Sequence, residues 1–280
     1  MGQPLVAGNY ARGVVAIDRD DITIRNGTME GFDEAVYLSR SNRLIVSNMI
    51  FRDPRVQAVN ANHSNEVIIE DSLFDLPISN IPLVEVGGIA VNGGFVRVNN
   101  IEVRDGTIGV AFGFAFVCDA AQSASNGEVL NSMFTRVNSA AVYLNCSTDV
   151  RIANNDISGM IEVAAIDAVA PFFGAITGLL IENNTIHDGS VGIVFGGATY
   201  SIISNNIVTD NQRHGIGMGE SEGCKVPAPG WDCFFTTANI IRDNVALGNS
   251  PDLMHDAGST GNTWLNNTCV TKDGIDIPDC

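Results

Sequence analysis

The chain has 280 residues, 45% of them hydrophobic, and a formal net charge of −17 at pH 7. Such an acidic chain is a poor partner for nucleic acid, because Lys and Arg side chains neutralise the phosphates. No stretch approaches eighteen uninterrupted apolar residues, so we expect no membrane span. The start, MGQPLVAGNYARG, lacks the basic and apolar regions of a signal peptide. We expect residues 1–12 to form an N-terminal extension or partial cap, and 13–280 to form one domain.

One pattern, apolar–any–Asn/Asp–any–any–apolar, recurs along the chain at a base period of 22 to 23 residues with occasional insertions. Asn tolerates a left-handed backbone better than other non-glycine residues, and stacked Asn side chains can hydrogen-bond along a column. We therefore predict a turn and an Asn ladder at these key residues, with an architectural role and not a catalytic one. They are Asn26, Asn48, Asp71, Asn100, Asn131, Asn154, Asn183, Asn205, Asp243 and Asn266.

A second pattern follows most key residues: a small residue and then alternating apolar and variable positions, as in AVYL from Ala35 and GIVF from Gly192. This alternation predicts a strand with one buried face. Repeats of this length cannot bury an apolar face alone, whereas stacked repeats can. The sequence therefore predicts an all-β fold, a parallel β-helix of about ten coils, with Phe51, Phe74 and Phe134 pointing inward.

The same strand pattern predicts two outward rows of side chains. They read Tyr37, Asn60, Ala90, Ala111, Tyr143, Asp167, Val194, Gly217 and Ser39, Asn62, Asn92, Gly113, Asn145, Val169, Gly196, Gly219. Polar and aromatic side chains suit sugar rings and hydroxyl groups. We therefore expect Tyr37, Asn60, Asn62, Asn92 and Asn145 to bind substrate. The insertions at 113–127, 168–177 and 219–233 follow this strand, and long loops on one side of a scaffold usually carry function.

Asp167 is the strongest catalytic candidate, because it replaces a neutral outward residue one coil from Tyr143. A Tyr and a carboxylate one coil apart can share proton abstraction and donation at C5 of a uronate. Arg213 or His214, two coils further on, can neutralise the substrate carboxylate or move a proton. Two alternatives stay open: a solvated Asp167 on an exposed strand, and a His214 that is only a turn residue before Gly215.

Weaker candidates lie elsewhere. Glu220, Glu222 and Asp232 in the largest insertion are a possible calcium site, and a merely acidic loop is the competing interpretation. We expect His63 and His187 to face solvent and assign no role to His255.

The six cysteines form three local pairs in the sequence: Cys224 with Cys233, Cys269 with Cys280, and Cys118 with Cys146. These pairs favour disulfides and an extracytoplasmic setting. Buried free thiols are the alternative.

The repeat GI-x-F … I-x-NN-x-I, over residues 13–269, resembles the pectate-lyase-like superfamily, and most closely its NosD-like and carbohydrate-binding/sugar-hydrolase repeats. The resemblance implies a single-stranded right-handed parallel β-helix. The superfamily includes polysaccharide lyases, polygalacturonases, alginate C5-epimerases and noncatalytic surface or phage proteins. The stretch DNQRHGIGM, residues 210–218, resembles the Arg-His-Gly segment of alginate epimerase modules, whereas the epimerase hallmark Tyr-Gly-x-Asp-Pro-His and the polygalacturonase motifs are absent.

Two functions remain in competition. The first is an extracellular enzyme acting on a polysaccharide, by β-elimination or C5 epimerisation of a uronate. The second is a noncatalytic carbohydrate-binding or surface structural protein, consistent with the missing motifs and the net charge. A third, hydrolysis by paired carboxylates, lacks a second carboxylate aligned with Asp167 in neighbouring coils.

Overall fold

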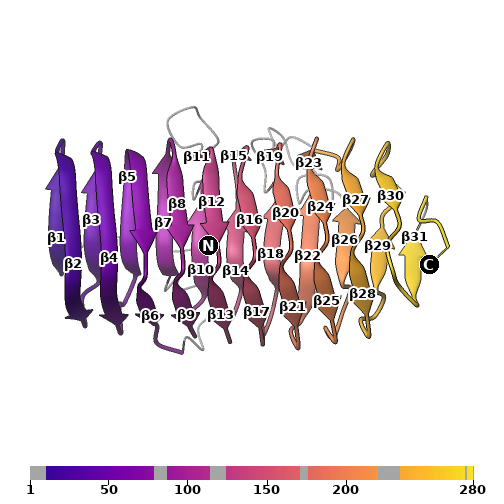
Figure 1. Ribbon diagram of the computed structural model, residues 1–280, viewed down its shortest axis with the longest axis horizontal. Helices are drawn as coiled ribbons and strands as arrows, with labels where there is room; N and C mark the ends of the chain where they lie inside the picture. The colour runs from indigo at the N-terminus through magenta and orange to yellow at the C-terminus, as the bar shows by residue number, and fades with distance from the viewer. Residues whose placement is uncertain are drawn as a thin grey trace, which may run out of the picture.

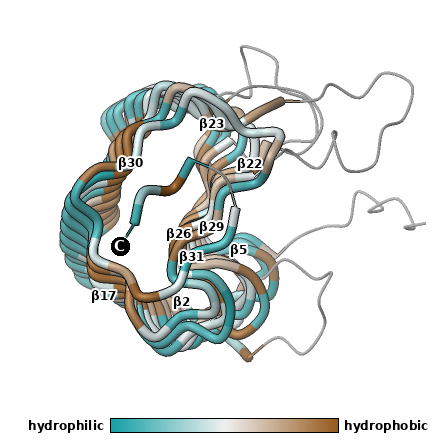
Figure 2. Tube along the Cα trace, turned by 90° about the vertical axis from the view of Figure 1, so that its right-hand side faces the viewer, coloured by the Kyte–Doolittle hydropathy of each residue, from teal (hydrophilic) through white to brown (hydrophobic). Residues whose placement is uncertain are grey.

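The computed structural model describes residues 11–78, 87–113, 124–170, 176–219, 234–274 and 276–279. Strands stack side by side along the long axis of the molecule (Figure 1), and their pairs are parallel. Seen down that axis, the chain winds around a closed cross-section (Figure 2). The described residues form no helix, and hence none able to cross a membrane. The predicted all-β, right-handed parallel β-helix is confirmed.

Three faces surround the interior, and we name them A, B and C in the order in which each coil visits them. Face A carries the small-apolar strands, namely β1 (Arg12–Ile17), β3 (Glu34–Ser39), β5 (Gln57–Glu70), β7 (Gly87–Gly93), β10 (Ile108–Phe112), β14 (Ala140–Leu144), β18 (Ala164–Val169), β22 (Val191–Gly196), β26 (Ile216–Gly219), β29 (Leu253–His255) and β31 (Lys272–Gly274). Short strands extend its edge: β11 (Ala124–Ser125), β15 (Ser147–Thr148), β19 (Ile176–Thr177) and β23 (Ala198–Thr199).

Faces B and C lie before and after the key Asn turn. Face B holds the second half of β5 and the strands β8 (Val96–Asn99), β12 (Gly127–Leu130), β16 (Arg151–Ala153), β20 (Leu180–Glu182), β24 (Ile202–Ser204), β27 (Ile240–Arg242) and β30 (Thr263–Leu265). Face C holds β6 (Leu73–Asp75), β9 (Glu102–Arg104), β13 (Met133–Thr135), β17 (Asp156–Ser158), β21 (Thr185–His187), β25 (Ile207–Thr209) and β28 (Val245–Leu247). The long strands β2 (Asp20–Glu30) and β4 (Asn42–Arg52) run through both faces.

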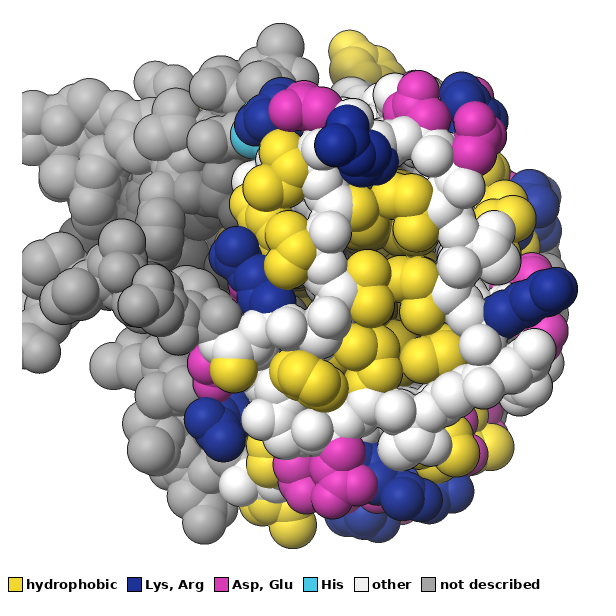
Figure 3. Space-filling model, turned by 90° about the vertical axis from the view of Figure 1, so that its left-hand side faces the viewer, with side chains coloured by type: hydrophobic (Ala, Val, Ile, Leu, Met, Phe, Trp, Pro, Cys, Tyr) yellow, Lys and Arg dark blue, Asp and Glu magenta, His cyan; other side chains and the backbone are white. Residues whose placement is uncertain are grey.

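The interior is a continuous stack of inward apolar side chains contributed by all three faces. Phe51, Phe74 and Phe134 are fully buried, which confirms their predicted inward orientation. The rings of Phe51 and Phe74 stack with centroids 4.9 Å apart, on adjacent coils. At the first described coil this interior is visible from outside, where apolar side chains lie inside a rim of charged ones (Figure 3).

All ten key residues adopt the predicted left-handed backbone, with φ between 51° and 59°. However, the continuous ladder is made by the residue that follows the key residue. Asn155, Asn184, Asn206, Asn244 and Asn267 form it: each of the first four donates its backbone N–H to the Oδ1 of the next. The key side chains are mostly exposed, and only some of them pair, such as Asn48 with Asn26. The predicted ladder is therefore displaced by one residue.

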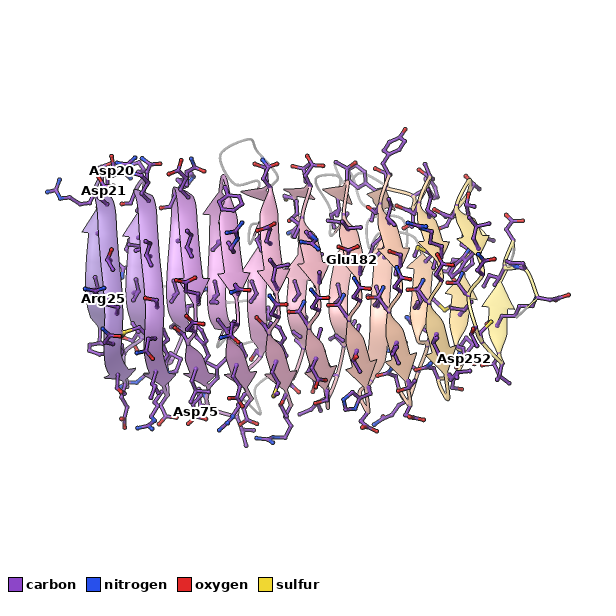
Figure 4. All side chains as sticks on the ribbon, viewed as in Figure 1. Asp20, Asp21, Arg25, Asp75, Glu182 and Asp252 are labelled. Atoms are coloured by element: carbon purple, nitrogen blue, oxygen red, sulfur yellow. The ribbon has the colours of Figure 1, made fainter. Side chains whose placement is uncertain are left out.

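Two further turns carry buried ladders that the sequence interpretation missed. Ser201, Asn239 and Asn262 form one of them. The other runs through Asn211 and Asn249 to Asp252, which lies among the last coils (Figure 4). The Asp252 carboxylate is 1% exposed and accepts hydrogen bonds from the backbone N–H groups of Val270 and Thr271 at 2.9 and 3.0 Å.

These bonds make the last coils sensitive to acid. Burial alone raises the pKa of Asp252, but the backbone N–H groups of Val270, Thr271 and Asn249 and the Asn249 amide outweigh burial and lower it. A lowered folded pKa means that the stabilisation is present above the unfolded value of about 3.9 and is lost as the pH falls through the folded value.

We expect Asp252→Asn to destabilise the last coils by roughly 1–3 kcal/mol at pH 7. The amide nitrogen that replaces Oδ2 is a donor, so it cannot accept the hydrogen bonds from the backbone N–H groups of Val270 and Thr271. Amide exchange at Val270 measures this loss locally. The difference from wild type should shrink as the pH falls below the folded pKa of Asp252. The exposed Asp273, on β31, provides the control Asp273→Asn. A difference that does not change with pH would contradict the role of the carboxylate.

Candidate active site

The outward column of face A brings two predicted catalytic residues onto neighbouring coils. Tyr143 on β14 is the direct partner of Asp167 on β18, and Asp167 is the partner of Val194 on β22. Val194 is in turn the partner of Gly217 on β26. Adjacent coils are roughly 4.8 Å apart, so Tyr143 and Asp167 are close enough to act on one sugar residue.

Two glycines on β26 admit side chains from other segments into this face. A Cβ at Gly217 would fall 2.6 Å from Cδ2 and 2.7 Å from Nε2 of His214, so the imidazole occupies the space over this glycine. A Cβ at Gly219 would fall 2.8 Å from Oδ2 of Asp256 in the same way. His214 and Asp256 therefore join the outward surface of face A, although neither lies on the repeated strand positions.

These groups line one cavity of about 430 Å³, which we call the face-A cavity. All four predicted catalytic residues, Tyr143, Asp167, Arg213 and His214, contribute to it. Apolar side chains supply much of the remaining wall, which is typical of small-molecule sites. They include Val163, Val169, Val191, Val194, Phe195 and Met254.

Burial excludes one of the alternatives from the sequence. Asp167 is only 8% exposed, so it is not a solvated residue on an open strand. His214 precedes β26 and is 9% exposed. Arg213 is exposed, and no acidic side chain among the described residues forms an ion pair with it. A buried carboxylate and an available guanidinium therefore share the cavity.

The cavity also contains carboxylates that the sequence analysis did not assign to it. Glu162 and Asp256 both line it. The expectation that no second carboxylate aligns with Asp167 in neighbouring coils holds, because its partners there are Tyr143 and Val194, but the cavity gains carboxylates from outside that column. The expectation rested on repeated strand positions alone, whereas Glu162 precedes β18 and Asp256 follows β29.

Two predicted substrate-binding residues lie away from the cavity and interact within the protein. The Arg12 guanidinium stacks on the ring of Tyr37, 3.7 Å from its centroid. Glu34, which is 4% exposed, pairs with Arg12 and accepts a hydrogen bond from the Asn60 amide at 2.8 Å. Four coils separate Tyr37 from Tyr143, or roughly 19 Å. Their sugar-binding role stays a prediction.

The other three predicted binders differ in exposure. Asn62 and Asn92 are partly exposed on adjacent coils, 3.5 Å apart between amide nitrogen and oxygen. Asn145 is 3% exposed, and its Oδ1 lies 3.2 Å from Sγ of Cys146. Asn145 is therefore buried and not open to solvent, and it lies just beyond the end of β14 at Leu144.

Several predictions fall outside the described residues. The calcium ligands Glu220, Glu222 and Asp232 do so, as do Cys118, Cys224, Cys233 and Cys280. Among the residues that the structure does describe, no cluster of three or more His, Cys, Asp or Glu side chains can hold a metal ion. Cys146 and Cys269 are both disulfide-bonded, and the pairings assigned to them stay predictions.

The remaining histidines lie outside the cavity. His63 is exposed in a left-handed turn, as expected. His187 is partly exposed, and its hydrogen bond to Asp188, aided by Asp156, raises its pKa although partial burial opposes the shift. His255 is fully buried and 3.1 Å from the amide of Asn262, so it belongs to the last coils of the interior.

Comparison with known proteins agrees with this architecture. The model of the right handed beta helix region matches residues 119–277, more than half of the chain, and the chain belongs to this family. No curated protein sequence matches it significantly.

Three solved structures illustrate the likeness in fold. PfbA, a surface adhesin of Streptococcus pneumoniae, has a TM-score of 0.64 at 13% identity, over 90% of this chain and 68% of PfbA. A mutant tailspike protein of E. coli bacteriophage HK620, in complex with pentasaccharide, has a TM-score of 0.57 at 14% identity, over 91% and 55%. A mutant of the periplasmic alginate epimerase AlgG has a TM-score of 0.51 at 14% identity, over 84% and 56%. The chain thus spans little more than half of the last two.

Proposed function

We propose that the face-A cavity binds an acidic polysaccharide outside the cytoplasm and catalyses β-elimination or C5 epimerisation of a uronate. One observation carries the proposal: a single cavity contains an available guanidinium, a phenol, an imidazole and a buried carboxylate. The disulfide-bonded Cys146 and Cys269 support the extracytoplasmic setting. The tailspike in complex with pentasaccharide and the alginate epimerase support a carbohydrate ligand.

Each group has a role in this chemistry. The proton at C5 of a uronate becomes acidic only when the adjacent carboxylate is neutralised, and Arg213 supplies the one guanidinium in the described lining. His214, Tyr143 or Asp167 then removes the C5 proton as general base. In epimerisation a second group returns a proton to C5 from the opposite side of the ring. In elimination the glycosidic C–O bond breaks instead, and the leaving oxygen takes a proton.

A second candidate is hydrolysis of a glycosidic bond. It is favoured by Glu162 and Asp256, which add carboxylates to the cavity that contains Asp167. Glycoside hydrolysis uses two carboxyl groups, one as acid and one as base or nucleophile. Hydrolysis leaves new reducing ends without unsaturated sugars, so the products distinguish it from elimination.

The test is incubation of the wild-type protein with alginate, polygalacturonate and hyaluronan. Absorbance of unsaturated ends detects elimination, NMR detects epimerisation, and new reducing ends that appear without that absorbance detect hydrolysis. We expect Arg213→Gln to lower kcat/KM on the active polymer by roughly 100-fold or more, the typical scale for losing a charge that binds the reacting group. The control is Arg151→Gln, which removes a partly exposed guanidinium that pairs with Glu182 on face B and does not line the cavity.

Equal losses in the two arginine variants would contradict the role of the cavity. Binding of a polymer without any change to it would favour the noncatalytic alternative, a carbohydrate-binding surface protein. The adhesin PfbA shows that the fold occurs in a surface protein.

A further inference from the structure

A second depression lies on the opposite side of the solenoid, at the key turn between faces B and C. It has a volume of about 570 Å³ and runs along the axis across five coils, from Asn48 to Asn154. Four steps between coils span roughly 19 Å. The view down the axis places β17, at one end of this depression, across the cross-section from β22 and β26 of face A (Figure 2). We call it the turn groove.

The floor and the two walls of the turn groove have different chemistry. The floor is Met49, Ser72, Ile101 and Ser132, all nearly buried, and the groove ends where Asn155 begins the continuous amide ladder. One wall is the row of key residues, Asn48, Asp71, Asn100, Asn131 and Asn154. The other is the outward column of face C, Ile50, Leu73, Glu102, Met133 and Asp156.

The amide wall retains hydrogen-bonding capacity. Asn48 and Asn131 each use one N–H, toward Asn26 and Asn99, both at 2.8 Å. Among the described residues, the Oδ1 atoms of these two side chains accept no hydrogen bond, and the Asn154 amide makes none. The outward amides of Asn48, Asn131 and Asn154 therefore present donors and acceptors to a ligand that lies along the axis.

The charges of the groove do not select an ionic ligand. It contains three carboxylates and no Lys or Arg, so a polyanion is disfavoured. The three carboxylates already have partners: Glu102 pairs with Arg104, Asp156 with His187, and Asp71 accepts from Asn100. What remains available is hydrogen bonding and apolar contact.

An extended peptide is also a poor fit. Peptides that bind sheets add a strand at a free edge. Here the strands run across the groove, and their backbone groups are used in pairing with the coils on either side, as β9 pairs with both β6 and β13. A sugar chain needs no strand edge, because its hydroxyl groups bind amides and its C–H faces pack on apolar side chains.

We propose that the turn groove binds a neutral polysaccharide chain lying along the solenoid axis, with its hydroxyl groups on the Asn wall and its ring faces on Leu73 and Met133. This site is separate from the face-A cavity, and its ligand is neutral where the ligand proposed for the cavity is acidic.

The test uses neutral β-1,4-linked oligosaccharides of glucose, xylose and N-acetylglucosamine, with binding followed by calorimetry and by NMR of the side-chain amides of Asn48, Asn131 and Asn154. Met133→Glu places a charge in the groove without touching the interior, since Met133 is 46% exposed. We expect it to weaken binding at least 10-fold. The matched control is Ile207→Glu, in the same outward column of face C, 47% exposed and beyond the groove. It should bind as wild type does.

Three results would overturn the proposal: no binding of any neutral oligosaccharide, equal binding by Met133→Glu and wild type, or binding of a Lys-rich peptide in place of the sugars. Turnover of a uronate polymer in the face-A cavity should be unchanged in Met133→Glu. Loss of groove binding and failure of the proposed activity are therefore distinguishable.

Discussion

Phe74→Ala is expected to lower the free energy of unfolding by about 3–5 kcal/mol. Phe74 is fully buried, stacks on Phe51, and has Val103 as its partner on the other side. The distance between coils is set by backbone hydrogen bonds on three faces, so the walls cannot close over the space that the ring leaves. The residual cavity then adds to the lost transfer free energy.

Urea denaturation followed by circular dichroism measures the effect. Phe235→Ala is the matched control, because Phe235 is 44% exposed and loses less contact on truncation. We expect it to cost less than half as much. Unfolding of both variants at the same urea concentration would contradict this prediction. It would mean that the interior relaxes around a missing ring and that stacking of the phenylalanines does not stabilise the early coils.

The repeat made most of the fold predictable. Key residues recur because each coil needs a left-handed turn, and inward and outward positions follow from the alternation on a strand. The period did not predict which of two adjacent Asn residues makes the turn and which one forms the ladder. In pairs such as Asn183–Asn184 both residues repeat together, and only the backbone shows that the first makes the turn and the second points inward to the ladder.

The repeat made the outward column of the candidate site predictable, and the predicted Arg213 and His214 also line the cavity although they lie outside that column. Tyr143 and Asp167 share an outward column, and their register is as expected. Asp256 was missed because it enters face A from beyond β29, into space that Gly219 leaves open. The signal available in the sequence was the pair of glycines at outward positions on β26, since a glycine in a strand often marks close approach of another group. His214 fills the other gap, over Gly217.

Asp167→Asn is expected to reduce turnover of a uronate polymer by roughly 100-fold or more, while affinity stays within a few-fold. The substitution keeps the size of the side chain and most of its hydrogen bonding, but removes a proton acceptor. It should therefore act on the transition state more than on binding. Asp149→Asn, which changes an exposed aspartate near the same coil, should leave turnover unchanged.

Tyr143 separates the enzyme from the noncatalytic alternative. Tyr143→Phe removes the phenolic hydroxyl and keeps the ring, so in an enzyme it lowers kcat, whereas in a binding protein it changes little. Tyr143→Ala removes the ring and should weaken sugar binding in both. If Asp167→Asn turns over the polymer as wild type does, the proton transfer does not involve Asp167. If reducing ends appear without unsaturated ends and Asp256→Asn alone abolishes them, the carboxylates of the cavity carry hydrolysis instead, and Tyr143 serves as a platform for the sugar ring.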